Sequence, residues 1–197
     1  MTLRSSTIVP FCVHVPSQTV YIVLAQIART QSGRSAAWGD LGGVPGNNES
    51  SESTAAREFY EESLGVFGEL KMEENLMTGQ YLIKCTFQYD DGSHSDYYVV
   101  EVPFDRMMAK RFRTIREELL LLPEGFNVEF LPDYLRDKIS GGNVGDEFFE
   151  KQALDWFSLD HLMDILSESS TIIRPSFSQP LSYIVSELLD LLYVPDT

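Results

Sequence analysis

Two β-rich runs open the chain, and a short turn separates them. Residues 7–14 (TIVPFCVH) and 19–28 (TVYIVLAQIA) are rich in apolar and β-branched side chains, and the tetrapeptide VPSQ lies between them. We therefore predict two strands that form a hairpin. Proline has no backbone N–H to donate to a neighbouring strand, so Pro10 predicts a sheet edge or a bulge for the first strand. The polar residues 29–37 (RTQSGRSAA) predict a loop.

A helical pattern follows, and β-rich runs resume after it. At about 100° per residue, residues 55–64 form a helix with an acidic side and a side suited to packing on a core. The mixed residues 66–75 predict a loop. Two β-rich runs occupy residues 76–104, and the Asp91-Gly92 dipeptide between them is a strong turn signal. Sheet elements on both sides of a helix predict an α/β/α sandwich, a fold of the α/β (α+β) class.

Residues 104–123 predict an amphipathic helix with one basic side. Four basic residues fall on an arc of about 120° at helical pitch, and four apolar residues on the other side would pack inward. The basic residues are Arg106, Lys110, Arg113 and Arg116, and the apolar residues are Met108, Phe112, Ile115 and Leu119. Glu117 lies inside the basic arc and neutralises part of it. Helical charge runs are usually solvated faces, but the acidity of the rest of the chain keeps a phosphate-binding role open.

The end of the chain returns to regular structure after an irregular segment. The glycine-containing residues 124–146 predict an irregular stretch, and residues 147–166 predict a loop, a short strand and a helix that Ser158 could cap. Residues 180–193 predict an amphipathic helix that packs on the core. We interpret residues 104–146 as an insertion that sets substrate specificity, as loops often do.

Composition sets bounds on size and charge. A chain of 197 residues with 43% hydrophobic and 12% aromatic residues suits one globular domain, residues 1–197, with a substantial core. The 30 acidic residues against 15 basic ones give a formal charge of −15. Such a charge disfavours nucleic acid and anionic membranes as partners. An anionic substrate would therefore be received through metal ions or a local basic patch.

Cysteine, histidine and hydropathy patterns exclude several other classes. Cys12 and Cys85 are the only cysteines, each in an apolar or strand-like segment, so we expect buried thiols without a disulfide framework or a zinc site. The three histidines are far apart in the sequence, and we expect each to be structural or exposed. No apolar run is long enough to span a membrane, and no clean signal peptide opens the chain. We therefore expect a cytoplasmic protein.

Three glutamates within five residues need a physical reason, because like charges at helical spacing repel. Glu58, Glu61 and Glu62 fall on one side of the predicted helix. Clustered carboxylate oxygens suit Mg²⁺ or Mn²⁺, which favour hard oxygen ligands. The simpler interpretation is an acidic face that is merely solvated, which charge runs usually indicate. We favour the metal site because the flanking residues also fit a known pattern.

That pattern is the Nudix box, G-x5-E-x7-R-E-U-x-E-E-x-G-U, which residues 43–66 resemble and in which U is a bulky aliphatic or aromatic residue. Gly43 is followed after five residues by Glu49, and after seven more by the run REFYEE, residues 57–62. One departure follows, because two residues, Ser63-Leu64, precede the final glycine where the family usually has one. The departure lengthens the helix end before its expected glycine cap and leaves the register of the glutamates unchanged.

The resemblance implies a mixed sheet within the α/β/α sandwich and a hydrolase for a diphosphate linked to another moiety, usually in a nucleoside diphosphate derivative. It implies attack on phosphorus by a water that Mg²⁺ or Mn²⁺ activates. The implied metal ligands are Glu58, Glu61, Glu62 and the carbonyl of Gly42. By position, Arg57 and Glu49 would brace the loop at Gly43 against the helix. The short segment that starts at Trp38 would form the strand that brings the loop at Gly43 to the metal site.

The resemblance does not fix the identity of the general base or of the substrate. Glu58 is one candidate base. Glu150 is another, because it lies six residues before Trp156, where some family members carry an additional metal-binding glutamate, and Glu147 is a weaker substitute. Tyr81 stands near the spacing at which dinucleoside-polyphosphate hydrolases carry a tyrosine that stacks on a base. Core packing explains this tyrosine equally well.

The leading hypothesis is a metal-dependent pyrophosphohydrolase that acts on a small nucleotide derivative, with Trp38, Lys110 and Arg113 as further candidate substrate contacts. A first alternative is an mRNA-cap or RNA-end hydrolase, in which the basic helix contacts RNA phosphates, although the net charge counts against it. A second alternative is a non-catalytic nucleotide-binding module, against which the intact glutamates count. Many family members are dimers, so a homodimer stays open.

Overall fold

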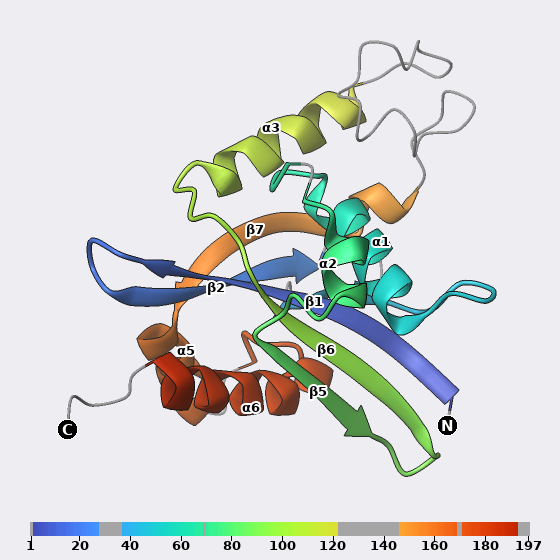
Figure 1. The fold of residues 1–197 in the computed structure, drawn as a ribbon. Coiled ribbons are helices and arrows are strands. Elements are labelled where there is room, and N and C mark those ends of the chain that lie inside the picture. Colours follow the sequence, from blue (N-terminus) through green and yellow to red (C-terminus); the bar gives the residue numbers. More distant parts are fainter. Residues whose placement is uncertain (1, 28–36, 69, 122–145, 169–170, 193–197) are drawn as a thin grey trace.

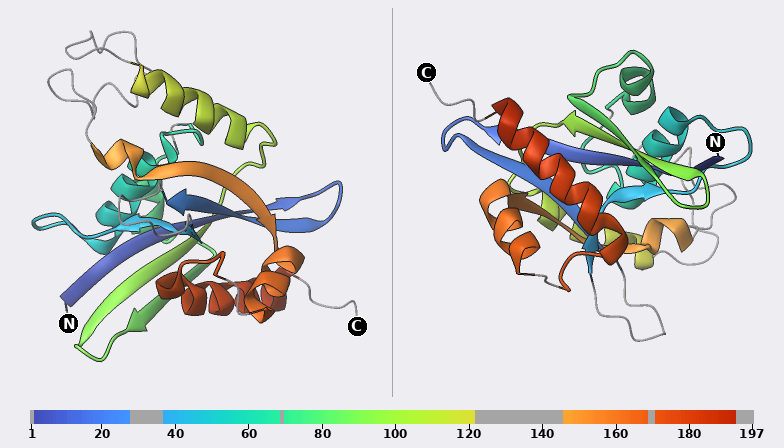
Figure 2. Two further views of the ribbon diagram at one scale, coloured as in Figure 1. Left: turned by 180° about the vertical axis from the view of Figure 1, so that it is seen from behind. Right: turned by 90° about the horizontal axis from the view of Figure 1, so that it is seen from below.

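A computed structural model describes residues 2–27, 37–68, 70–121, 146–168 and 171–192. Within these residues, seven strands form one sheet, and helices cover both of its faces (Figures 1 and 2). The strands are β1 (Thr2–His14), β2 (Thr19–Ile27), β3 (Trp38–Gly39), β4 (Leu41–Gly43), β5 (Ile83–Gln88), β6 (Ser93–Glu101) and β7 (Lys151–Ser158). The helices are α1 (Ser51–Ser63), α2 (Met72–Met77), α3 (Met108–Leu120), the short 3-10 helix η3 (Asp146–Phe149), α5 (Leu159–Ser167) and α6 (Pro175–Leu192).

Strand β1 lies inside the sheet and pairs with three other strands. It runs parallel to β6, and it runs antiparallel to β2 through residues 11–14 and to β4 through residues 6–8. Strand β5 extends the sheet beside β6, while β3 and β7 both pair antiparallel with β2. One parallel pair among antiparallel pairs makes a mixed sheet. The predicted hairpin of β1 and β2 and the predicted α/β/α sandwich are therefore confirmed.

The prediction of a sheet edge or a bulge at Pro10 is wrong, because β1 is an interior strand and residues 9–11 stay in register with β6. Pro10 is buried and pairs with Val100 of β6. The carbonyl of the next residue, Phe11, accepts a hydrogen bond from the N–H of Val102 at 2.8 Å, so its backbone faces β6 and that of Pro10 faces the other way. On that other side, pairing with β4 stops at Ile8 and pairing with β2 starts at Phe11. The missing N–H therefore falls between two partner strands and removes no ladder hydrogen bond.

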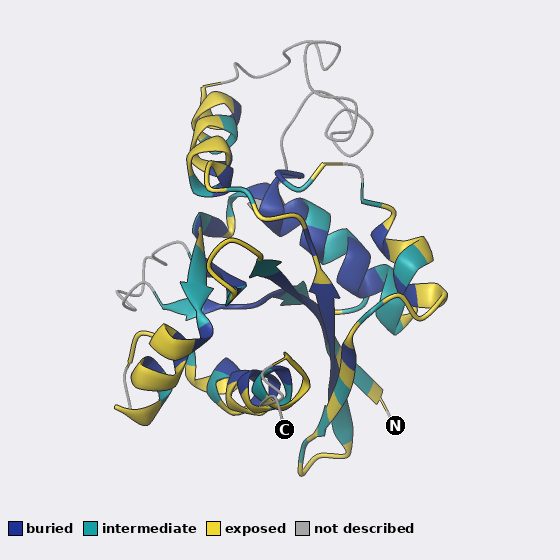
Figure 3. Cartoon of the chain, turned by 60° about the vertical axis from the view of Figure 1, so that its left-hand side comes forward, coloured by how far each residue is buried: buried dark blue, intermediate teal, exposed yellow. Residues whose placement is uncertain are grey.

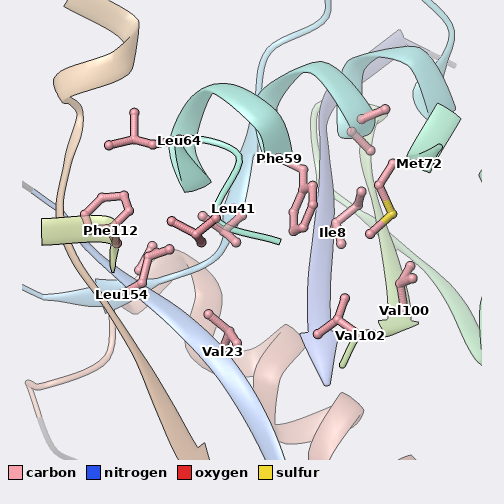
Figure 4. Close-up of a cluster of buried hydrophobic side chains, with 14 of the residues drawn as sticks. Ile8, Val23, Leu41, Phe59, Leu64, Met72, Val100, Val102, Phe112 and Leu154 are labelled. Carbon is pink, nitrogen blue, oxygen red and sulfur yellow. The ribbon is translucent and has the colours of Figure 1, made fainter. Parts of the chain in front are cut away.

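The sheet separates two hydrophobic cores, because successive residues of a strand point to opposite faces. Ile8 and Tyr98 belong to the core beneath α1, whereas their neighbours Val9 and Tyr97 belong to the core beneath α5 and α6. In the first core, Phe59 of α1 lies against β1 (Figure 4). The buried residues follow the sheet and the inner sides of the helices, and exposed residues gather on their outer sides (Figure 3).

Helix α1 starts earlier than predicted because a serine caps it. The Ser50 side chain accepts a hydrogen bond from the backbone of the first turn at 3.1 Å, and the helix begins at Ser51 rather than at Ala55. At the other end, the cap is Leu64, which is buried and left-handed with φ 52°. Gly65 follows with φ 63°. The extra residue of the box therefore takes the capping position that the prediction assigned to the glycine.

Other boundaries also differ from the predictions, and β1 begins at Thr2 rather than at residue 7. Helix α2 replaces part of the loop predicted at 66–75, and it buries Met72 and Leu76 in the first core. Strand β5 begins at Ile83, later than the β-rich run that starts at residue 76. Helix α6 begins at Pro175, so Pro180 lies inside it rather than at its start.

In the second half, α3 begins at Met108 rather than at residue 104, while the predictions for its apolar side and for the cap of α5 agree with the structure. On α3, three of the expected apolar residues are buried and Ile115 is half-buried against the first core. The Ser158 side chain caps α5 by accepting a hydrogen bond from the N–H of His161 at 3.3 Å. The segments 29–37 and 124–146 lie outside the described residues, apart from the last residue of each.

Cys12 is buried and Cys85 is half-buried, and both are free thiols. Within the described part of the chain, no helix combines the length and the apolarity that crossing a membrane requires.

Candidate functional site

Strand β4 and helix α1 bring the residues of the box together. Strand β4 pairs with β1 up to Gly43, and the chain then turns through residues 44–50 into α1. On α1, Phe59 and its neighbours on the apolar side are buried in the first core, which fixes the rotation of the helix. Arg57 and Glu58 lie off this apolar side. Their side chains therefore point toward the loop that leaves β4, where their contacts are found.

Arg57 is the centre of a network of charged side chains. Its Nε and Nη2 lie 2.8 and 3.1 Å from the two carboxylate oxygens of Glu49, a bidentate pair. Its Nη1 donates to Glu58 Oε1 at 2.8 Å and to Glu61 Oε2 at 2.9 Å. Its Nη2 also donates to the carbonyl of Val44 at 3.1 Å. One guanidinium therefore holds three carboxylates and the loop after β4.

Glu49 links the loop to the start of α1. Its Oε2 accepts hydrogen bonds from the N–H of Gly46 at 2.7 Å and from the hydroxyl of Thr54 at 3.1 Å. The hydrogen bond from Arg57 lowers the pKa of Glu49 to about 2, and the donors of Gly46 and Thr54 act in the same direction. Glu49 therefore stays ionised well below neutral pH and keeps its hold on the arginine.

The acidic side of α1 is largely withdrawn from solvent. The side chains of Glu58 and Glu61 are 15% and 12% exposed, and that of Glu62 is 2% exposed. Burial raises the pKa of Glu58, while the charge of Arg57 acts against this effect. A merely solvated helix face would leave its carboxylates in water. The structure therefore excludes that interpretation for these three glutamates.

Glu62 has a partner that the sequence did not reveal. Its Oε1 lies 2.8 Å from Nζ of Lys151, the first residue of β7, and its Oε2 accepts a hydrogen bond from the N–H of Gly42 at 2.8 Å. The Lys151 side chain is only 4% exposed. Burial raises the pKa of Glu62, and the Lys151 ammonium acts against this effect. The sequence drew attention to this segment through Glu150. Lys151 itself belongs to no recognisable motif, because it is a single lysine far from the box.

The two glycines of β4 permit a close approach of other groups. A Cβ on Gly43 would lie 2.6 Å from Oε2 of Glu58, and a Cβ on Gly42 would lie 2.6 Å from the carbonyl oxygen of Ser6. Both distances are too short for a carbon atom. A side chain at Gly43 would displace a carboxylate, and one at Gly42 would displace the backbone of β1.

The carboxylates suit a hard divalent cation in part. Glu58 and Glu61 converge on one arginine nitrogen, and carboxylate oxygens are the ligands that Mg²⁺ and Mn²⁺ favour. By contrast, both oxygens of Glu62 are already engaged, one by Lys151 and one by a backbone N–H. Among the residues that the structure describes, no group of three His, Cys, Asp or Glu side chains is arranged to hold a metal ion. Glu58 and Glu61 therefore fit such a site better than Glu62 does.

The other charged residues singled out in the sequence do not join this cluster. Glu150 is exposed, and its charge contributes to raising the pKa of Glu58. The side chain of Glu147 lies outside the described part of the structure. Lys110 and Arg113 are exposed on α3.

The two aromatic candidates for substrate contact pack against the cores. Trp38 meets Phe157 edge-on, with 4.9 Å between the ring centres, at the margin of the second core. Tyr81 meets Tyr98 edge-on at 5.4 Å, at the margin of the first core. Both side chains are half-buried, so packing accounts for both positions.

A pocket of about 260 Å³ opens beside the glycines of β4. Two guanidinium groups line it: Arg4 lies 4.5 Å from the ring centre of Tyr89, and Arg174 forms an ion pair with the buried Asp40. Asp40 is the one carboxylate among the lining residues. The pocket is therefore more basic than the chain as a whole. Sequence reasoning missed it because only the fold brings the start of β1, the turn before β6 and the segment before α6 together.

Comparisons with known proteins give matches among solved structures alone. No protein-family model matches the sequence, and no curated protein matches it. Similar solved structures include MutT/nudix family proteins from Enterococcus faecalis, with 14% identity and a TM-score of 0.44, and from Listeria innocua, with 18% identity and a TM-score of 0.44. Another is an Ap4A hydrolase from C. elegans, with 12% identity and a TM-score of 0.42.

The matches differ in how much of each chain they cover. The alignment covers 80% of this chain and 44% of the Enterococcus faecalis protein, so the present chain spans less than half of that protein's length. For the Listeria innocua protein the shares are 94% and 95%, and for the C. elegans protein they are 93% and 99%.

Proposed function

We propose that this chain is a Nudix-type hydrolase that cleaves a diphosphate linkage in a nucleoside diphosphate derivative. The observation that carries the proposal is the Arg57 network, in which the carboxylates of Glu49, Glu58 and Glu61 meet at one guanidinium. The spacing of these four residues in the sequence resembles the Nudix box, and their side chains form one cluster at the loop after β4. Carboxylates that are largely withdrawn from water and held in this way suit the binding of a divalent cation better than they suit a solvated surface.

Each residue of the cluster has a positioning role in this proposal. Glu49 fixes Arg57, and Arg57 keeps the carboxylates of Glu58 and Glu61 directed toward a common point. Glu58 and Glu61 would hold Mg²⁺ or Mn²⁺, and Gly43 leaves the space that Glu58 needs beside the backbone. When bound, such an ion supplies an activated water and neutralises charge that develops on the phosphate oxygens.

Glu58 and Glu150 are the candidates for the general base. Burial raises the pKa of Glu58, which makes this carboxylate a stronger proton acceptor than an ordinary glutamate. Glu150 is exposed between η3 and β7, and its charge acts on Glu58. If Glu58 is the base, Glu150→Gln keeps turnover and only shifts the acidic limb of the pH profile, whereas loss of turnover in Glu150→Gln would assign the base to Glu150.

We place the non-reacting end of the substrate in the pocket beside β4. The guanidinium groups of Arg4 and Arg174 suit phosphate oxygens, and the ring of Tyr89 offers an apolar face. Tyr81 and Trp38 already pack on the cores, so we favour the pocket over them as the site of substrate contact. Arg4→Ala is therefore expected to raise KM more than it lowers kcat.

A nucleotide-binding module without catalysis is the second candidate. The observation that favours it is the pair of Glu62 with Lys151, which occupies a carboxylate that the Nudix resemblance assigns to the metal. Such a module would bind a nucleotide in the pocket beside β4 and release it unchanged.

The test is product release from a panel of nucleotides in the presence of Mg²⁺ or Mn²⁺. The panel contains ADP-ribose, NADH, dinucleoside polyphosphates, nucleoside triphosphates and capped RNA. We expect turnover of at least one compound, and we expect Glu58→Gln to lower it on the order of 100-fold or more. Glu118→Gln removes an exposed carboxylate on α3 and serves as the matched control, with an unchanged rate. Nucleotide binding without turnover in either metal would favour the binding module.

A further inference from the structure

The pair of Lys151 and Glu62 is the most enclosed ion pair at the candidate site. Nζ of Lys151 lies 2.8 Å from Oε1 of Glu62, and the two side chains are 4% and 2% exposed. The other Glu62 oxygen accepts the N–H of Gly42 at 2.8 Å. A carboxylate with both oxygens engaged and almost no contact with water has its charge neutralised within the protein.

The fold holds Lys151 in this position from several sides. Lys151 pairs with Ile27 of β2, and its carbonyl accepts a hydrogen bond from Nε of Arg116 on α3 at 2.9 Å. Helix η3, which precedes it, packs beside α1 and buries Phe148 in the first core (Figure 1). The backbone of Lys151 is therefore fixed beside α1, and its side chain is only 4% exposed.

A divalent cation and this ammonium would compete for the same carboxylate. Mg²⁺ binds carboxylate oxygens at about 2.0–2.1 Å, so an ion on Glu62 would sit beside Nζ, and the two positive charges would repel in a site closed to water. Glu58 and Glu61 also pair with a cation, but it engages only Oε1 of Glu58 and Oε2 of Glu61, so the second oxygen of each can meet an ion. Their cation, Arg57, has a side chain that is 27% exposed and lies at the rim of the site.

We propose that Lys151 is a built-in counterion for Glu62 that takes the place of a divalent cation, so that the chain binds metal through Glu58 and Glu61 without Glu62. The inference rests on the proposed function, since that function is what calls for a metal beside these carboxylates. It assigns Lys151 a positioning role: it holds the Glu62 carboxylate, and through it the N–H of Gly42, in place whether or not metal is bound.

The experiment measures Mn²⁺ binding to the whole chain, without substrate, from the electron paramagnetic resonance signal of the free ion. Wild type is expected to bind through the Glu58 and Glu61 carboxylates, and Glu58→Gln to weaken binding at least tenfold. Lys151→Met is expected to bind one more ion per chain, or to bind Mn²⁺ at least tenfold more tightly. Lys71→Met removes the same charge from an exposed position and is expected to bind as wild type does. Equal stoichiometry and affinity in wild type and a folded Lys151→Met chain would overturn the inference.

A second variant keeps the test decisive if Lys151→Met does not fold. The double variant Lys151→Met with Glu62→Gln removes both buried charges and is expected to bind Mn²⁺ as wild type does. A tenfold loss in the folded double variant, checked by circular dichroism, would show that Glu62 is a ligand and would overturn the inference. Failure of the proposed function is a separate result, because it appears as absent turnover while the Mn²⁺ measurements keep their outcome.

Discussion

The two ends of the acidic side of α1 differ in how their charge is neutralised. At one end, Arg57 pairs with three carboxylates, and its side chain is 27% exposed. At the other end, Lys151 pairs with Glu62 alone, and both side chains are almost fully enclosed. A rim arginine can exchange its partners through water, whereas a buried lysine in a strand cannot. The surroundings of each glutamate, rather than its place in the sequence motif, decide which ones are available to a ligand.

The largest expected effect comes from breaking the buried pair. Lys151→Met leaves the Glu62 carboxylate enclosed without a counter-charge, and loss of one partner of a buried pair costs about 3–5 kcal/mol of unfolding free energy. Urea denaturation measures this loss. Replacing both residues by methionine removes both charges and is expected to recover most of the stability. If the double variant is as unstable as the single one, packing rather than charge explains the effect.

A smaller effect is expected from substituting alanine for Gly42 or Gly43. The two variants separate an effect on stability from an effect on metal binding. In Gly42→Ala the new Cβ meets the backbone of β1 at Ser6, which costs about 1–3 kcal/mol of unfolding free energy. In Gly43→Ala it meets the end of the Glu58 side chain, which can move, so stability changes little while Mn²⁺ binding weakens. Thermal unfolding and metal titration of both variants check the contrast. Equal losses of stability would contradict it.

The next smaller effect on stability is expected from Arg57→Lys, which tests the cluster of carboxylates around Arg57. Lysine keeps the charge but cannot form the bidentate pair with Glu49 together with the contacts to Glu58 and Glu61. Because these carboxylates can still meet water, we expect a loss of about 1 kcal/mol of unfolding free energy. Denaturant titration measures it. A loss as large as that of Lys151→Met would remove the difference between the two ends.

The smallest expected effect is a pH dependence that belongs to Glu49. Its pKa is about 2 in the folded chain against an ordinary value of 4.5, because Arg57 stabilises the charged form. The resulting stabilisation is fully present above pH 4.5 and is lost as the pH falls toward 2. Glu49→Gln is therefore expected to flatten the fall of the unfolding midpoint across this window. An unchanged slope would show that other carboxylates govern the acid limb.

The sequence predicted the sheet, the box helix and the basic helix because each depends on a local pattern. The strands expected from the apolar and β-branched runs 7–14 and 19–27, the Asp91-Gly92 turn and the apolar side of α3 all appear in the structure. Two observed helix boundaries differ from the predicted ones. Helix α1 starts earlier because Ser50 caps it, and α6 starts before Pro180 and continues across it. The sandwich itself followed from the order of these elements.

What the sequence could not provide was any contact made across the fold. Pro10 was assigned to a sheet edge or a bulge because its unpaired position depends on where β4 stops and β2 starts. Lys151 and the two arginines of the pocket meet their partners only through the folded sheet. The burial of Glu62 was equally hidden, because a helical repeat gives the direction of a side chain and not what covers it.

The pairing of β1 and β2 has a consequence for how the protein is made. Both strands belong to the first 27 residues, yet β1 needs β6, which ends at Glu101, and β2 needs β7, which ends at Ser158. On the ribosome, the hairpin therefore waits on the order of ten seconds for its last partner at usual rates of synthesis. During that interval an apolar strand edge stays open, and Glu62 has no lysine beside it. Completion of the acidic cluster and completion of the sheet are thus the same late step of folding, and nascent chains that stop before β7 are the ones in which chaperone binding should be sought.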